Sequence, residues 1–246
     1  MTKYLTNNYS VINLYKKPSS RSEIVTQMIF GESFSISKKT IKWLKIKIKE
    51  DGYNGYIKNK KFQKFLKPTH KINILKSKVF KFPNYKMKIN EIPFGSKIKV
   101  LENKKQFFRF SEGWVSKSDV RPINYREKNP FRKISMFKNI RYKWGGKSFN
   151  GIDCSALIQV FLNFNNKFCP RDAKDQFKFF KKNIKLNKIK KNDIIYWKGH
   201  VALVLSNKKL IHAYGPMKKT VIMGIKQTIK RIEQTAKLKV IGIKRL

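Results

Sequence analysis

Cysteine and histidine are scarce in this chain. Its 246 residues include two cysteines, Cys154 and Cys169, and three histidines. Two cysteines cannot form the set of cross-links that holds many small secreted domains together, and free thiols fit a reducing compartment. A cysteine or histidine that stands in an unusual local setting is therefore a candidate for chemistry.

Long apolar runs are missing as well. No stretch of the sequence approaches the ~20 apolar residues that a membrane-spanning helix needs. The first nine residues lack the apolar segment behind a positive start that marks a secretory signal. We therefore expect a soluble, cytoplasmic protein with no membrane partner, folded around packed cores because 41% of its residues are hydrophobic.

Acidic residues are few: there are 14, against 58 lysines and arginines, which gives a net charge of +44. Such an excess is typical of proteins that bind nucleic acid or an anionic surface. Only nine of the basic residues are arginine, and the lysines are spread from Lys3 to Lys244. We favour biased codon usage over specific nucleic-acid binding, and expect acidic small substrates to be attracted in either case.

The first half of the sequence repeats itself with a period of about 60 residues. Three pairs of segments correspond: Leu14–Pro18 with Val79–Pro83, Ile29–Glu32 with Pro93–Ser96, and Gly55–Ile57 with Gly113–Val115. Short alternating runs, such as residues 43–48, predict strands. We therefore predict two small β-barrels, at residues 10–66 and 69–123, with junctions near Pro68 and Pro122.

After Pro122 the pattern changes to mixed helix and strand. Apolar spacing predicts helices over residues 131–140, 153–164 and 172–182. Apolar runs predict buried strands at residues 194–197, 201–205 and 210–213, with a hairpin turn at residues 206–209. A cysteine-bearing helix packed on an antiparallel sheet makes residues 124–246 an α+β domain.

A glycine-rich loop delivers Cys154 to the start of the second of these helices. Residues 141–154 read Arg-Tyr-Lys-Trp-Gly-Gly-Lys-Ser-Phe-Asn-Gly-Ile-Asp-Cys. Asp153 can cap the helix, and the N–H groups and dipole at its start favour a thiolate. His200 and His212 follow on strand-like runs, and a paired histidine lowers a thiol pKa to roughly 3.5–7.5 in known cases. This pattern indicates a nucleophile with its base and an orienting group.

The motifs Tyr-x-Trp-Gly-Gly, Asn-Gly-x-Asp-Cys-Ser, Gly-His-Val and Ile-His-Ala occur in this order, and through them residues 135–246 resemble the NlpC peptidases. These are papain-like bacterial enzymes that cut peptidoglycan peptides. The resemblance implies Cys154 as nucleophile, His200 as general base and His212 as the residue that orients it. It also implies that Tyr142 lines the site near the oxyanion. Residues 10–123 resemble bacterial SH3-like barrels, which often accompany cell-wall enzymes.

The combination resembles the muropeptide-recycling branch of γ-D-glutamyl-L-diamino-acid endopeptidases, of dipeptidyl-peptidase VI type. This likeness implies that Asp153, with Ser155 beside it, holds the free amine of the substrate's N-terminal L-Ala. It also implies that Tyr53 of the first barrel helps to close the site. The segment 169–176 is similar to the family's Pro-Arg-Asp-Ser-x-x-Gln stretch, which makes Asp172 a further substrate-site candidate.

Two positions depart from the family pattern. Ala156 replaces the usual glycine after Cys-Ser and should be tolerated on a helix, whereas Ala173 replaces a serine that often contacts substrate. Cys169 has no family role. A zinc site formed by the two cysteines with the two motif histidines is disfavoured because the chain lacks closely spaced ligand pairs. The expected mechanism uses neither a metal nor a cofactor.

We therefore expect a cysteine endopeptidase that cleaves the γ-D-Glu–diamino-acid bond of free stem peptides, with a muropeptide as its partner. Two alternatives remain: a wall- or nucleic-acid-binding protein with an inactive peptidase-like domain, and acyl transfer or lipid-ester hydrolysis by the same thiol. One geometric question is also open. In a tight hairpin His212 would lie opposite Leu203 or Val204, so that strand twist, a bulge or a longer turn must bring it to His200.

Overall fold

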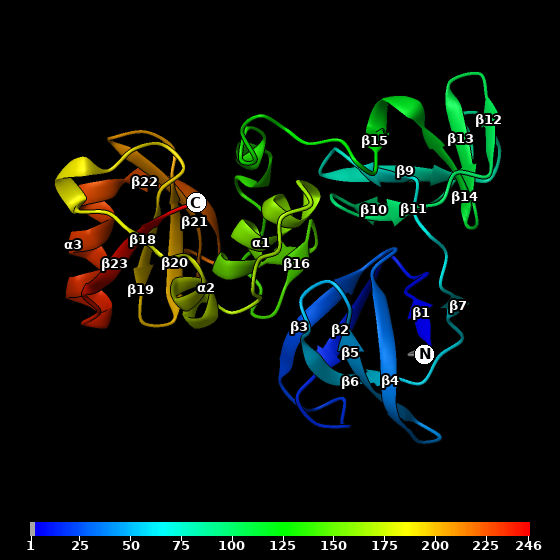
Figure 1. The fold of residues 1–246 in the computed structure, drawn as a ribbon, viewed down its shortest axis with the longest axis horizontal. Helices are drawn as coiled ribbons and strands as arrows, with labels where there is room; N and C mark the ends of the chain where they lie inside the picture. Colours follow the sequence, from blue (N-terminus) through cyan, green and yellow to red (C-terminus); the bar gives the residue numbers. More distant parts are fainter. Residues whose placement is uncertain (1–2) are drawn as a thin grey trace.

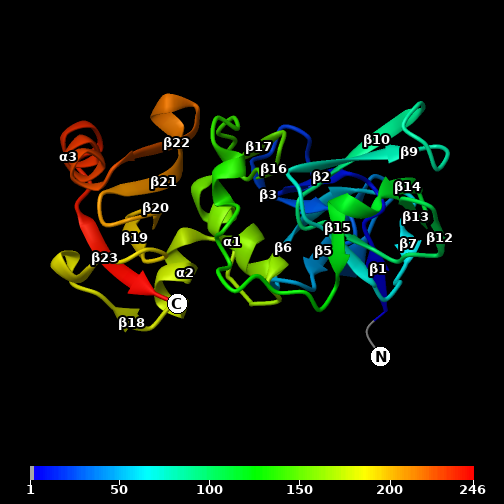
Figure 2. The same ribbon diagram turned by 90° about the horizontal axis from the view of Figure 1, so that it is seen from above.

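The computed structural model describes residues 3–246 as three successive units. We name them the N-terminal unit (residues 3–66), the second unit (69–123) and the C-terminal unit (124–246). The two strand-rich units lie side by side at one end of the molecule (Figure 1). Helix α1 (Cys154–Phe164) lies between the sheet of its own unit and the N-terminal unit (Figures 1 and 2).

The N-terminal unit is an antiparallel sheet in the order β3-β2-β6-β5-β4-β1-β7. Its strands are β1 Tyr4–Thr6, β2 Val11–Tyr15, β3 Ile24–Ile29, β4 Ser33–Lys39, β5 Trp43–Ile48, β6 Asn54–Lys58 and β7 Gln63–Lys64. Alternation along β5 buries Leu44, Ile46 and Ile48 and leaves the intervening lysines exposed. Because β1 pairs with β4 and β7, the unit begins ahead of the predicted boundary at residue 10.

The second unit folds two sheets around one apolar cluster, with strand orders β10-β9-β14-β13-β12 and β11-β8-β15. Its strands are β8 His70–Ile72, β9 Lys76–Phe80, β10 Lys88–Pro93, β11 Lys97–Ile98, β12 Glu102–Lys104, β13 Phe107–Phe110, β14 Gly113–Ser116 and β15 Val120–Pro122. The segments that repeat in the sequence occupy corresponding places. Gly31 and Gly95, for example, form the same turn with φ of 80° and 81°.

The phenylalanine before each of these glycines packs into the unit that follows. Phe30 of the N-terminal unit belongs to the core of the second unit, where its ring lies 5.4 Å from that of Phe110. Phe94 of the second unit belongs to the core of the C-terminal unit and stacks on Phe164 at 4.7 Å. The three units are thus joined by shared cores.

The C-terminal unit contains a six-stranded antiparallel sheet in the order β18-β23-β19-β20-β21-β22. The strands of this sheet are β18 Lys182–Asn183, β19 Ile194–Trp197, β20 His200–Val204, β21 Lys209–Tyr214, β22 Lys219–Gly224 and β23 Val240–Arg245. Two further strands, β16 Lys147–Ser148 and β17 Gly151–Ile152, pair with each other. Its other helices are α2 Ala173–Phe179 and α3 Ile225–Ala236. Leu203 and Ile211 pack with α1, whereas the alternating residues Ala202 and Leu210 pack with α3, so the two helices cover opposite faces.

The predicted helix over residues 131–140 is wrong. Only a 3-10 turn forms there, at Ile134–Phe137, and Asn139 adopts a φ of 66°, which no continuing helix permits. Within the described part of the chain, none of the helices is both long and apolar enough to cross a membrane.

Candidate active site

Cys154 begins α1, and Asp153 caps this helix as predicted. The Asp153 Oδ1 atom accepts a hydrogen bond of 2.8 Å from the N–H of Ala156. The preceding loop packs tightly on the N-terminal unit. Gly145 adopts a φ of 69°, and a Cβ at this position would lie 2.5 Å from the carbonyl oxygen of Ile24. Glycine is therefore required where β3 approaches the loop.

The thiol of Cys154 is buried. Burial, followed by the neighbouring Asp153 carboxylate, raises its pKa to about 12, while a hydrogen bond from the Val201 backbone and the charge of Arg171 act to lower it. The lowered pKa expected from the sequence is therefore wrong for this conformation. The free-energy cost of burying a thiolate beside a carboxylate exceeds the stabilisation that the start of the helix provides. The resting thiol is protonated and needs a base during attack.

His200 and His212 are in contact, with 2.8 Å between His200 Nε2 and His212 Nδ1. The register of β20 and β21 pairs Leu203 with Ile211 and Val204 with Leu210, so the expected position of His212 opposite Leu203 or Val204 is wrong. The two imidazoles meet beyond the last paired residues of these strands, on the side away from the hairpin turn.

Both imidazoles are neutral at neutral pH. Burial lowers the pKa of His200 to about 4, and burial together with His200 lowers the pKa of His212 to about 3. If His200 keeps Nδ1 free as a base, its Nε2–H donates to His212 Nδ1. The ring of Tyr214 stacks on His212 at 4.7 Å and holds it in place. Because the Val201 backbone bonds the Cys154 sulfur, the thiol lies against the residue that follows His200.

Tyr142 lies near the thiol. Burial raises the pKa of its phenol, and the nearby Cys154 and Asp153 raise it further, so that it remains a neutral donor. Its ring packs against Gly215, where a Cβ would lie 3.5 Å from the ring. The backbone N–H of Tyr142 donates to the Lys218 carbonyl at 2.8 Å, which fixes the segment.

Arg171 is a site residue that sequence reasoning missed, although it lies inside the Pro-Arg-Asp stretch. Its buried guanidinium donates to both carboxylate oxygens of Asp153, to Ser155 Oγ at 3.0 Å and to Thr26 Oγ1 at 2.7 Å. Asp153 also accepts the N–H of Gly145 at 3.0 Å. With its oxygens occupied by donors from the described residues, Asp153 does not fit the predicted role of holding a substrate amine.

Tyr53 and Asp172, 119 positions apart in the sequence, meet across the boundary between units. The Tyr53 hydroxyl donates to Asp172 Oδ2 at 3.3 Å. Burial and the Asp172 carboxylate raise the pKa of Tyr53 to about 12, and burial also raises the pKa of Asp172. An ionised carboxylate held by one phenol keeps acceptor capacity for a further donor, such as an ammonium group.

The N-terminal unit is fixed to this site by buried polar contacts. Lys147 Nζ forms an ion pair with Glu32, and both side chains are buried. Gln159 Nε2 donates to Asp51 Oδ2 at 3.0 Å. Nearer the surface, Trp144 Nε1 donates to a carboxylate oxygen of Glu23 at 2.9 Å. These contacts make the N-terminal unit a fixed wall of the site.

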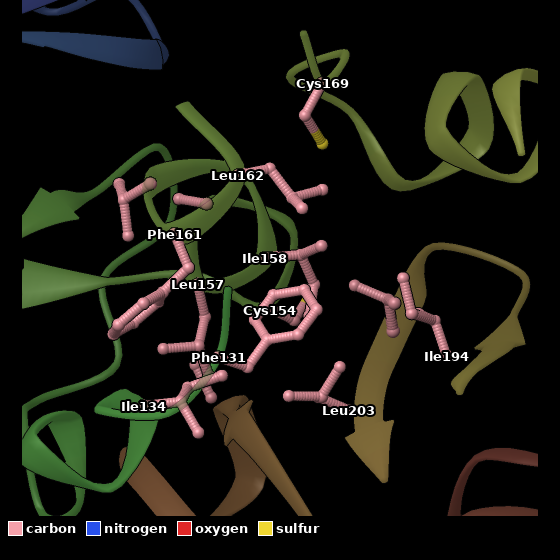
Figure 3. Close-up of a cluster of buried hydrophobic side chains, with 14 of the residues drawn as sticks. Phe131, Ile134, Cys154, Leu157, Ile158, Phe161, Leu162, Cys169, Ile194 and Leu203 are labelled. Atoms are coloured by element: carbon pink, nitrogen blue, oxygen red, sulfur yellow. The ribbon is translucent and has the colours of Figure 1, made fainter. Parts of the chain in front are cut away.

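Cys169 belongs to the same apolar cluster as Cys154 but lies on the segment before α2 (Figure 3). It is fully buried, and burial raises the pKa of its thiol. Its sulfur contacts the Pro170 carbonyl at 3.5 Å. Among the described residues, no three His, Cys, Asp or Glu side chains group in a way that could hold a metal ion.

Two family models match the chain. Residues 139–235 match the NlpC/P60 family, and residues 14–62 match the bacterial dipeptidyl-peptidase SH3 domain. The chain contains an NlpC/P60 domain preceded by an SH3 domain. The first of these spans the glycine loop, the cysteine and both histidines, and the second spans Tyr53. These matches support a peptidase activity for the chain.

Several known proteins are similar to this chain. A gamma-D-glutamyl-L-lysine dipeptidyl-peptidase of Bacillus subtilis is 26% identical over 238 residues, which cover 87% of this chain and 80% of that protein. Dipeptidyl-peptidase 6 of Lysinibacillus sphaericus is 40% identical over 72 residues, or 29% of this chain and 27% of that protein. The fold is that of an NlpC/P60 family protein from Bacillus cereus, with a TM-score of 0.84 at 19% identity, covering 98% of this chain and 99% of that one.

Proposed function

We propose that this protein is a cysteine endopeptidase that cleaves the bond between γ-D-glutamate and the diamino acid of free peptidoglycan stem peptides. The observation that carries the proposal is the joint placement of Cys154, His200 and His212 in an NlpC/P60 domain. The bond is suggested by relatives named as dipeptidyl-peptidases of γ-D-glutamyl-lysine.

Acylation begins with attack of the Cys154 sulfur on the γ-carbonyl of glutamate. Because the resting thiol is protonated and the imidazole is neutral, the proton passes to His200 as the carbon–sulfur bond forms. The neutral phenol of Tyr142 beside the thiol is our candidate donor to the developing oxyanion. His200 then gives its proton to the nitrogen of the diamino acid, and the carbon–nitrogen bond breaks.

Deacylation reverses these roles. His200 removes a proton from water, which attacks the thioester and returns the sulfur as a thiol, releasing the dipeptide L-Ala-D-Glu. The His212 ring, stacked on Tyr214, keeps the His200 ring in one orientation through both proton transfers. No step requires a group that the chain does not itself supply.

The free amine of the substrate is assigned to Asp172 with Tyr53. Asp153 is occupied by Arg171, whereas the half-buried Asp172 carboxylate accepts from the single phenol of Tyr53. An ammonium group would form a charge-assisted bond there, which is stronger than a bond between neutral groups. We assign to Asp153, Ser155 and Arg171 the role of positioning the helix start that carries the nucleophile.

The N-terminal unit explains why the substrate would be a free peptide and not an intact wall strand. Its contacts with the peptidase domain support this view, since a glycan attached to L-Ala would have to pass the N-terminal unit next to the proposed amine site. We further propose that the second unit is also SH3-like, since the repeated segments adopt corresponding turns. A role in recycling of shed stem peptides follows from both assignments.

The experiment is a comparison of L-Ala-γ-D-Glu-meso-diaminopimelate with its N-acetylated form, with mass analysis of the products. We expect the free peptide to be cut at the γ-D-Glu bond and the acetylated peptide to be cut on the order of 10²-fold more slowly, because a charge-assisted bond is lost beside a closed wall. Equal kcat/KM for both peptides would reject the recycling role. Cleavage of neither peptide by folded protein would reject the proposed function.

A further inference from the structure

The rim of the site differs in charge on its two sides. On the side of the N-terminal unit lie the carboxylates of Asp172 and Asp51, of which Asp172 contacts Tyr53. On the other side, in the segments next to Tyr142 and His200, three exposed side chains are basic. They are Arg141, Lys198 and Lys218.

Each of these basic residues is tied to the site by the backbone. Lys198 lies in the turn between β19 and β20, two residues before His200. Lys218 accepts the N–H of Tyr142 through its carbonyl at 2.8 Å, and Arg141 directly precedes Tyr142. None of the three forms an ion pair with another described residue. They are therefore available to a ligand.

The acidic residues of the C-terminal unit do not pair with these three cations. The unit has six of them, and three are engaged by arginines: Glu127 by Arg132, Asp153 by Arg171, and Asp193 by Arg245. The others are Asp172, which contacts Tyr53, Asp175 in the first turn of α2, and Glu233 on α3. The field of the three exposed cations is thus not cancelled by a paired carboxylate among the described residues.

The proposed orientation of the substrate sends its leaving residue across this basic side. With the amine at Asp172 and the γ-carbonyl at Cys154, the diamino acid departs past Tyr142, toward Lys218 and Lys198. The side chain of L-lysine would bring an ammonium group into this field. The side chain of meso-diaminopimelate ends in a carboxylate as well as an ammonium group, and the carboxylate can pair with the lysines.

We propose that the basic rim formed by Lys198, Lys218 and Arg141 selects a diamino acid that carries a side-chain carboxylate over one that ends in an ammonium group alone. This inference rests on the proposed function. An exposed ion pair contributes up to ~1 kcal/mol, or about fivefold, so three cations acting on one carboxylate give a preference of roughly five- to twentyfold in kcat/KM.

Three peptides test the inference on the intact chain at low salt: L-Ala-γ-D-Glu linked to meso-diaminopimelate, to meso-diaminopimelate with its side-chain carboxyl amidated, and to L-lysine. We expect the first to be cleaved best and the other two to be alike, because amidation removes the charge and leaves the size nearly unchanged. The preference should shrink as salt is raised from 0.01 to about 0.5 M, since screening shortens the reach of exposed charges.

Substitutions in the basic rim test whether these residues cause the preference for the meso-diaminopimelate peptide. Lys198→Glu combined with Lys218→Glu should abolish or invert the ratio of kcat/KM for the meso-diaminopimelate and L-lysine peptides. The control Lys226→Glu changes an exposed lysine in the first turn of α3, on the other side of the sheet from α1, and should leave the ratio unchanged.

The outcomes separate the two proposals. Equal or better cleavage of the L-lysine peptide by the native chain, or a ratio that the double variant leaves unchanged, overturns the charge selection while the peptidase assignment stands. Absence of cleavage of all three peptides rejects the proposed function itself. A preference that amidation does not reduce would show that size, and not charge, decides.

Discussion

At the scale of single residues, the two thiols of the chain provide a matched pair for the nucleophile. Both are buried, but Cys154 begins α1 near Tyr142, whereas Cys169 lies before α2 with its sulfur on the Pro170 carbonyl. We expect Cys154→Ala to abolish peptide cleavage with the fold intact, because the covalent route is lost. Cys169→Ser should leave turnover close to that of the native chain. Activity above a trace in the first variant, measured by peptide release, would remove Cys154 from its role.

The two histidines should differ in the size of their effect. His200→Ala removes both proton transfers and should lower kcat by ~10²–10⁴-fold. His212→Ala leaves the base in place but poorly oriented, so its loss should be smaller. Circular dichroism of both variants provides the control for folding, since His212 is fully buried. Equal losses in the two folded variants would contradict the assignment of base and orienting residue.

The pH dependence of kcat/KM should reflect the lowered pKa of the buried His200 imidazole. Burial lowers the pKa of His200 to about 4, so the neutral base persists well below the ordinary histidine value of about 6.5. We expect kcat/KM for the free tripeptide to hold from neutral pH to about pH 5, and to fall only as His200 becomes protonated near pH 4. An acid limb with its midpoint near 6.5, in protein that remains folded, would contradict this.

The chemistry of the site was predictable at this scale, but its electrostatics was not. Local sequence identifies four candidates, because capping, helix starts and motif spacing are local signals. They are Asp153, Cys154, His200 and His212. Local sequence does not identify Arg171, because its role depends on hydrogen bonds to four partners in other segments. The direction of the thiol pKa was missed for the same reason: burial is a property of the fold.

At the scale of elements, the repeated turn of the first two units allows a controlled test. Gly31 and Gly95 share a φ near 80°, but a Cβ on Gly31 would lie 1.9 Å from the Lys97 carbonyl oxygen, whereas at Gly95 the nearest atom is 3.6 Å away. Gly95→Ala should cost only the left-handed backbone strain of ~1–2 kcal/mol in the free energy of unfolding. Gly31→Ala should add ~1–3 kcal/mol from the clash. Equal losses in thermal denaturation would contradict this packing.

Element prediction succeeded where the periodic signal was strong. The strand predicted at 194–197 matches β19, and the helix predicted over residues 153–164 matches α1, which begins one residue later at Cys154. The predicted helix over residues 131–140 is reduced to a 3-10 turn at Ile134–Phe137, a difference that apolar spacing does not encode. Helix α3 was not predicted, although Ile225, Ile229 and Ile232 recur at helical spacing.

At the scale of the whole molecule, the peptidase domain depends on the units before it. Removing residues 1–123 would leave Lys147 without its partner Glu32 and would expose the face of α1 on which Phe94 stacks. Lys147 would then be solvated, so the main loss is the apolar surface of α1 that Phe94 covers, because burial of such surface is the dominant favourable contribution to a stability that is small overall. We expect residues 124–246 alone to give no cooperative thermal transition, and the full chain to give one. A sharp transition in the fragment would contradict this dependence.

The interface between units was beyond sequence reasoning. The internal repeat indicated two similar N-terminal modules, and the likeness to a peptidase family placed Tyr53 near the site. Nothing in the spacing of residues indicated that Phe30 and Phe94 leave their own units, or that Thr26 and Glu32 reach side chains of the C-terminal unit. Such contacts join segments that are far apart in the sequence, and they arise only from the packing of complete units.

The outward-facing phenylalanines also bear on synthesis of the chain. The ribosome synthesises the N-terminal unit first, before the core that buries Phe30 exists. The second unit follows, before the core that buries Phe94 exists. Each unit is finished only by its successor, so assembly runs in one direction along the chain. The last core to close is the one that holds Cys154, and the nucleophile is therefore organised only after the walls that restrict access to it are in place.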